Sequence, residues 1–186
     1  RDELETMLDF IGADRLVGAE EWRRRALAEK LEGWEICLTF DDALKCQFDI
    51  AAPVLESRGL TAFFFVYTAP MGGAPERLEV YRYLRTTAYP EVSHFYEVFF
   101  HALDESGLGA LVEEHRSEFD DTYLGDFPFY TDEDRWFRFV RDEVLGPQRY
   151  NAVMDQMVTA AGLDAHALID HLWMSRSDLR DLHQKG

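Results

Sequence analysis

The sequence contains few cysteines, few basic residues and no long apolar run. Its 186 residues include only Cys37 and Cys46, too few for a disulfide scaffold, so we expect a reducing compartment, the cytoplasm. No apolar run approaches the roughly 20 residues that span a bilayer, and the start does not resemble a signal peptide. We therefore expect no membrane segment, although the chain begins with Arg1 rather than Met, so an N-terminal piece is expected to be missing.

Basic side chains are outnumbered by acidic ones. Lys and Arg total 19 against 36 Asp and Glu, which gives a net charge of -17. A polyanion would be repelled by such a chain, so no nucleic-acid partner is expected. Apolar residues make up 47% of the sequence, and this share is enough to form a folded core.

The first third of the sequence has the pattern of an α/β fold. The runs 34–40 and 61–67 are nearly all apolar, which is typical of buried strands. A helical pattern over 45–58 lies between them, with a fresh start expected at Pro53 and an end at Gly59. Strand, helix and strand in about thirty residues predict a right-handed parallel βαβ unit.

Helical patterns dominate elsewhere. From residue 70 onwards they follow one another, which indicates an insertion into the α/β part. The last helix begins at Ser175, an N-cap with Asp178 three residues on, and is expected to end at Gly186 with Leu179 and Leu182 facing inward. A strand should follow such a helix, so we expect the domain to be incomplete at its C-terminus. The other predicted helices are 2–11, 19–30, 76–86, 91–105, 108–119, 132–145, 148–161 and 164–172.

Two adjacent carboxylates, Asp41 and Asp42, follow the first predicted strand. Ligands bind at the carboxyl ends of strands in α/β sheets, and neighbouring carboxylates repel each other unless a cation or a donor compensates. The alternative is structural: one aspartate caps the helix at Lys45 and the other is solvated. Position alone leaves both interpretations open.

The surrounding sequence resembles a known family. Leu38–Asp42, Ala52–Gly59 and Thr61–Val66 resemble the first motif of the polysaccharide deacetylases, the NodB-homology domain of carbohydrate esterase family 4. Trp173–Gly186 looks like the helix that leads into the second motif. The aromatic stretch Phe63–Tyr67, together with residues 78–83, looks like a branch linked to bacterial surface polysaccharides such as the O-antigen of lipopolysaccharide.

The resemblance implies an architecture. The fold would be α/β, an incomplete distorted (β/α) barrel of the NodB-homology type with a long helical insertion. Residues 1–69 would form the N-terminal part of the deacetylase barrel, residues 70–172 the insertion, and residues 173–186 a helix that returns to the barrel, which is incomplete at both ends.

The resemblance also implies roles for individual residues. Asp41 matches the catalytic base and Asp42 the aspartate metal ligand, while two histidines of a His-(Ser/Thr)-x-x-His segment are expected after Gly186. The divalent metal, usually zinc, polarises the acetyl carbonyl and acidifies a water, whose proton the base accepts. The family usually has glycine where this chain has Ala43; if that position needs a positive φ, alanine costs about 1 kcal/mol.

The implied function is a hydrolase, a metal-dependent deacetylase that removes N-acetyl or O-acetyl groups from a carbohydrate in a bacterial cytoplasm. The alternative is an inactive deacetylase-like protein that binds glycans or assists assembly. A Mg²⁺-dependent phosphotransferase with Asp41 as nucleophile is a third hypothesis, disfavoured by the surrounding motif. The acetylated carbohydrate is the expected partner.

Other candidate residues are better explained structurally. His94, Glu97 and His101 share a predicted helix face, but the apolar stripe beside them favours solvated or hydrogen-bonded histidines over a metal site. His183 falls within a helix rather than on a ligand-bearing loop. Aromatic residues at helical spacing are typical of a core; if any aromatic side chains stack on sugars, those of the loop 125–130 are favoured.

Overall fold

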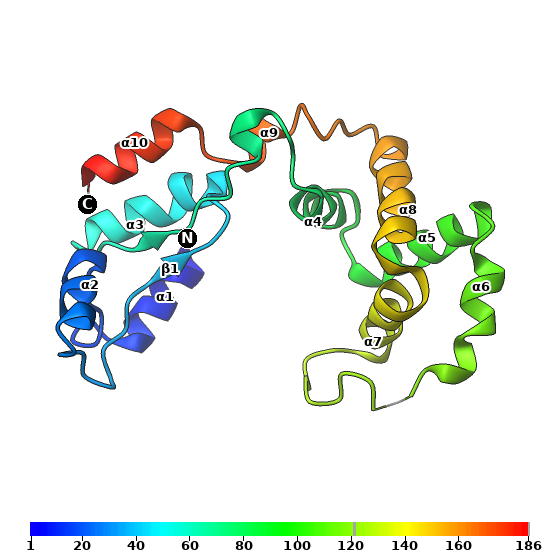
Figure 1. Ribbon diagram of the computed structural model, residues 1–186, viewed down its shortest axis with the longest axis horizontal. Helices are drawn as coiled ribbons and strands as arrows, with labels where there is room; N and C mark the ends of the chain where they lie inside the picture. The colour runs from blue at the N-terminus through cyan, green and yellow to red at the C-terminus, as the bar shows by residue number, and fades with distance from the viewer. Residues whose placement is uncertain (121, 186) are drawn as a thin grey trace. The chain divides into compact units, whose positions relative to one another are not determined.

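The computed structural model describes residues 1–120 and 122–185. The chain packs as two compact units, which we call unit 1 (Arg1–Glu76 with His166–Gly186) and unit 2 (Arg77–Ala165). Both chain ends belong to unit 1 (Figure 1). Helical residues make up 61% of the structure.

The elements of unit 1 come from two separate parts of the sequence. The chain leaves unit 1 after η2 and returns to it at α9. In order, unit 1 contains α1 (Asp2–Ile11), α2 (Ala19–Leu27), β1 (Thr39–Phe40), the π-helix η1 (Gln47–Ala51), α3 (Ala52–Ser57), β2 (Phe63–Phe64), the 3₁₀-helix η2 (Pro70–Gly72), α9 (Ile169–Leu172) and α10 (Arg176–Lys185).

The expected incomplete (β/α) barrel is wrong. Among the described residues, the sheet consists of β1 and β2 alone, each of two residues, and helices dominate. The predicted strand 34–40 pairs with 61–67 only through its last two residues, Thr39–Phe40, opposite Phe63–Phe64. Phe65, Val66 and Tyr67 are 40–56% exposed. An apolar run becomes a long strand only where neighbouring strands hydrogen-bond to it. The sequence pattern shows the apolar character but not the pairing.

The predicted parallel pairing itself is present. Thr39 lies opposite Phe63 and Phe40 opposite Phe64, with α3 in the connection between the two strands. Before β1, Ile36 forms an isolated parallel bridge with Leu16. A small core covers one face of these strands, where the Phe40 and Phe64 rings stack with centroids 5.0 Å apart. The fully buried side chains of this core are Leu8, Val54 and Leu55, and those packed against them are Leu4, Leu16, Leu38, Phe40, Leu60, Ala62 and Phe64.

The helices of unit 1 follow their sequence signals. The start of α10 is a reciprocal cap, as predicted: the Asp178 N–H donates to Ser175 Oγ (3.1 Å), and the Ser175 N–H donates to the Asp178 carboxylate (2.8 Å). The helical stretch before Pro53 is wound as a π-helix, and α3 begins at Ala52. Gly59 follows α3 with a φ of 65°, a conformation that glycine adopts without strain. The expected helix end at Gly186 lies outside the described residues.

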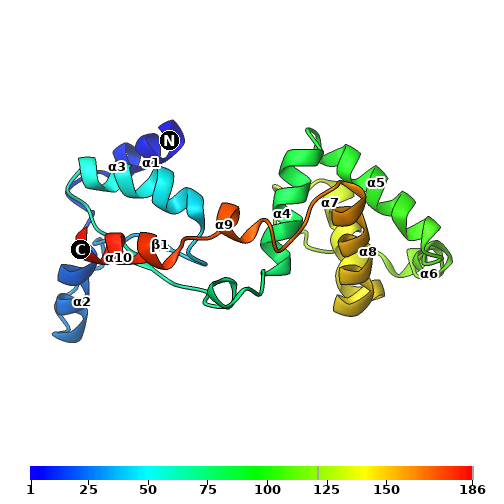
Figure 2. The same cartoon turned by 90° about the horizontal axis from the view of Figure 1, so that it is seen from above.

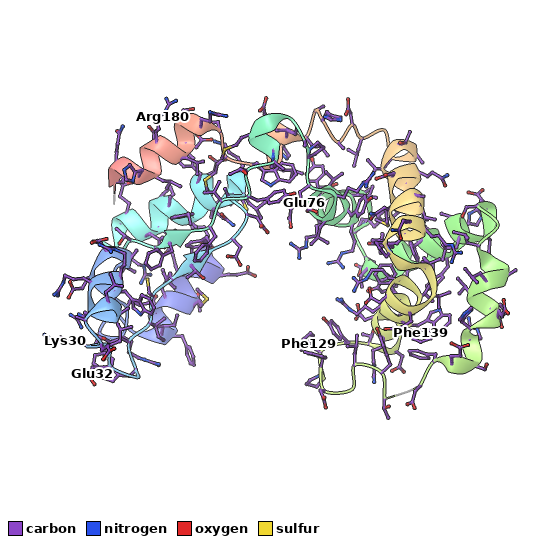
Figure 3. All side chains as sticks on the ribbon, viewed as in Figure 1. Lys30, Glu32, Glu76, Phe129, Phe139 and Arg180 are labelled. Carbon is purple, nitrogen blue, oxygen red and sulfur yellow. The ribbon has the colours of Figure 1, made fainter. Side chains whose placement is uncertain are left out.

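Unit 2 is helical around an aromatic core. The helix α8 packs against both α4 and α5 (Figure 2), and Phe139 lies among the side chains of this unit (Figure 3). Tyr81, Phe95, Tyr96 and Phe99 are at most 4% exposed, which confirms the structural interpretation of these aromatics. The elements are α4 (Arg77–Ala88), α5 (Val92–Glu105), α6 (Gly109–Glu114), the 3₁₀-helix η3 (Arg116–Glu118), α7 (Asp132–Phe139), the π-helix η4 (Val140–Leu145) and α8 (Gly146–Ala160).

Within the described residues, we find no helix that combines the length and the apolar character needed to cross a bilayer.

Candidate functional site

The Asp41–Asp42 pair lies directly after β1, at its carboxyl end. Asp41 is exposed and Asp42 is half-buried. The chain turns sharply here, because Asp42 has a φ of 69° and Ala43 a φ of 53°. Left-handed backbone costs an L-residue roughly 1–2 kcal/mol. Ala43 is also 1% exposed, so the position where the family usually has glycine does need a positive φ and is enclosed.

The side chain of Gln47 holds this turn. Gln47 Nε2 donates to the Asp41 carbonyl oxygen (2.7 Å), while Gln47 Oε1 accepts from the Leu44 N–H (3.1 Å). One amide therefore ties the residue before the positive-φ pair to the residue after it. Gln47, not an aspartate, caps the Leu44 N–H. Sequence reasoning missed this residue, although a glutamine three residues after a helix N-cap is a recognised signal.

The chain returns to the same turn some 130 residues later. The Met174 N–H donates to the Ala43 carbonyl oxygen (2.8 Å), and Leu44 forms an isolated antiparallel bridge with Trp173. Trp173 is 3% exposed, and its indole N–H is buried without a hydrogen-bond partner among the described residues. The turn is therefore enclosed on the side of Ala43 and open at Asp41.

A second link joins the helix after the turn to α10. Lys45 Nζ lies 2.9 Å from the Asp178 carboxylate and 3.4 Å from that of Asp49. Desolvation acts to raise the pKa of Asp178, but the Ser175 N–H, the Lys45 ammonium and the Ser175 hydroxyl outweigh it and hold the pKa below its usual value. The hydrogen bond to Asp178 raises the pKa of Lys45. The ion pair between Lys45 and Asp178 therefore links the start of the helix after the turn to α10.

The described residues do not make a complete metal site. Among them, no group of three His, Cys, Asp or Glu side chains is arranged to hold an ion. His94 contacts the Tyr89 ring (5.5 Å between centroids), and His101 Nδ1 lies 3.6 Å from Glu105, as expected of structural or solvated histidines. His183 lines a groove against α3 and β2 rather than the turn. Of the two predicted site residues, Asp42 is the one whose partial burial suits a ligand.

The loop before α7 carries exposed aromatic rings. Phe127 is 44% and Phe129 70% exposed, and Figure 3 shows Phe129 on this loop. The Phe129 and Tyr130 rings contact each other edge-on with centroids 4.6 Å apart, and the Arg138 guanidinium lies 4.0 Å from the Tyr130 ring. This is the loop that the sequence favoured for stacking on sugars, and its rings are accessible.

No family model, curated protein or solved structure matches this chain. The resemblance to the polysaccharide deacetylases therefore stays a prediction, based on Leu38–Asp42, Ala52–Gly59, Thr61–Val66 and Trp173–Gly186.

Proposed function

We propose that this chain carries the carboxylate half of the active site of a metal-dependent carbohydrate deacetylase, with Asp41 as the base and Asp42 as a metal ligand. The observation that carries the proposal is the pair of carboxylates at the end of β1, held in a turn of two positive-φ residues. Strained backbone of this kind gathers at functional sites. The substrate would be an acetylated sugar of a bacterial surface polysaccharide or its precursor, handled in the cytoplasm.

Each carboxylate has an environment that suits its proposed role. Asp41 is exposed, so its carboxylate can reach a water molecule or a substrate. Asp42 is half-buried, and burial favours a fixed ligand orientation. One carboxylate does not hold a catalytic divalent ion by itself, so the described residues fit only part of such a site. Two histidines of the second motif would have to join Asp42.

A bound zinc would polarise the acetyl carbonyl and acidify a water molecule. The residues of this chain would hold the two carboxylates in position. Gln47 fixes the carbonyl of Asp41 and thereby the backbone that carries the base. The Met174 N–H fixes Ala43 from the opposite side, so the two carboxylates project from a turn held at both ends.

The test uses the complete gene product and two single variants. Asp42→Ala should lose bound zinc, measured by elemental analysis, and with it acetate release from an N-acetylated chitooligosaccharide. Asp41→Ala should keep the zinc and lose acetate release by about 10²-fold or more, as general-base removal does. Unchanged zinc content in Asp42→Ala would rule out Asp42 as a ligand. An encoded protein without a His-(Ser/Thr)-x-x-His segment would rule out the deacetylase.

A non-catalytic glycan-binding protein is the second candidate, and the exposed rings of Phe127 and Phe129 favour it. Aromatic faces stack on sugar rings without any catalytic group. If this candidate is correct, Phe129→Ser weakens glycan binding in calorimetry while Asp41→Ala leaves binding unchanged. Loss of acetate release in Asp41→Ala would instead support the enzyme.

A further inference from the structure

A groove of about 710 Å³ runs along β2 within unit 1. Leu55 of α3 and Leu182 of α10 line it together with Phe63 and Phe64 of β2. Consecutive strand residues point to opposite faces of a sheet. A groove that is lined by both Phe63 and Phe64 therefore follows the edge of β2 rather than one face.

The edge that faces the groove carries backbone hydrogen-bonding groups. The N–H groups of Phe63 and Phe65 donate to the carbonyls of Leu38 (3.0 Å) and Phe40 (2.7 Å) on the β1 side. Since successive N–H groups of a strand alternate in direction, the Phe64 N–H points away from β1. In the described part of the chain, the sheet ends at β2. The groove thus combines an open strand edge with apolar walls.

The far wall of the groove is the apolar side of α10. Leu179 and Leu182 line the groove, and both are half-buried. Arg180 lies on the outer side of the same helix (Figure 3). Two ion pairs hold α10 in this place: Lys45 with Asp178 (2.9 Å) and Lys185 with Glu56 (2.7 Å). The groove therefore lies between β2 and a helix that ion pairs join to α3 and to the segment after β1.

We propose that this groove is a β-augmentation site for an extended segment of another protein, with apolar side chains at alternate positions and lysine or arginine at its flanks. An added strand hydrogen-bonds to the edge of β2, and its alternate side chains fill the apolar groove. Basic flanks follow from charge complementarity, because Glu20 lines the groove beside the Glu56–Lys185 ion pair and the chain as a whole carries a net charge of -17. The site is separate from the Asp41–Asp42 turn and does not depend on the proposed function.

The test is binding of a fluorescein-labelled peptide, Lys-Lys-Thr-Val-Thr-Val-Thr-Val-Lys-Lys, to the whole chain, followed by fluorescence anisotropy. Two further peptides carry N-methyl groups on all valine amides or on all threonine amides. In a paired strand, only one of these sets faces β2. One methylated peptide should therefore lose binding by roughly tenfold or more, while the other binds within about threefold of the parent. Equal binding of the two methylated peptides would refute strand addition.

Two matched variants locate the site. Leu182→Glu places a charge in the apolar wall and should weaken peptide binding by roughly tenfold or more. Gln184→Glu adds the same side chain and the same charge at an exposed position of α10 outside the groove, and it should bind like the parent. Circular dichroism checks that both variants fold. Equal binding by Leu182→Glu and Gln184→Glu would overturn the proposal, as would a dimer of the chain in sedimentation that the peptide does not dissociate.

Discussion

Replacing Gln47 by leucine tests whether one side-chain amide holds the acidic turn. The change keeps a side chain of similar length and removes both hydrogen bonds, at 2.7 Å to the Asp41 carbonyl and at 3.1 Å from the Leu44 N–H. A net hydrogen bond contributes about 0.5–1.5 kcal/mol. The bond to Asp41 is exposed and that from Leu44 partly buried, so we expect Gln47→Leu to lower the free energy of unfolding by about 1–2 kcal/mol.

The assay is urea unfolding followed by tryptophan fluorescence, since Trp22, Trp34 and Trp173 all belong to unit 1. Gln184→Leu is the matched control, because it makes the same substitution at an exposed position of α10. It should change the free energy of unfolding by less than about 0.5 kcal/mol. Equal effects of the two substitutions would refute the role of Gln47.

A double-mutant cycle separates the turn from helix capping. If Gln47 holds Ala43 at positive φ, Ala43→Gly relieves the strain and Gln47→Leu should then cost less. We expect a coupling energy of about 0.5–1 kcal/mol between the two positions, which are close enough to interact. Strict additivity would mean that Gln47 acts as a helix cap alone.

Three further substitutions probe other features of the fold. Ala43→Val should lower the free energy of unfolding by about 2–4 kcal/mol in urea titration, because a β-branched residue is strained at φ 53° and the site is 1% exposed. The pKa of Asp178 is lowered in the folded state, so its contribution to the free energy of unfolding is present above about pH 4 and is lost as the pH falls through the folded-state pKa. Asp178→Asn should flatten this loss of stability, measured by urea unfolding between about pH 5 and 2. Phe99→Ala should lower the free energy of unfolding in urea titration by about 3–5 kcal/mol, since Phe99 is 0% exposed.

Local signals in the sequence predicted the helices better than the strands. The Ser175–Asp178 cap is encoded by side chains three residues apart, and the structure shows both of its hydrogen bonds. The strands depend on partners far along the chain. The apolar run from Thr61 to Tyr67 therefore forms only a two-residue strand, and the barrel that the resemblance implied is wrong. Base, ligand and metal assignments came from the resemblance and stay predictions.

The same difference between local signals and long-range contacts applies to the candidate site. The apolar run before Asp41 and Asp42 predicted that they follow a strand, and the capping pattern could have predicted the role of Gln47. The contact between Met174 and Ala43 could not be predicted, because no local pattern links residues that are 131 positions apart, the separation of 174 from 43. Tertiary hydrogen bonds of this kind emerge only from the folded chain.

The backbone at Asp42 and Ala43 bears on function independently of any resemblance. A positive φ costs Ala43 roughly 1–2 kcal/mol and Asp42 less, because aspartate tolerates this region better than most L-residues. Glycine at either position would remove much of that cost. The structure instead keeps a carboxylate at the first position and offsets the strain with Gln47 on one side and the Met174 N–H on the other. Glu29 and Leu124 also have positive φ; at this turn the strain coincides with a pair of carboxylates at the end of β1, which supports the proposed role of Asp42.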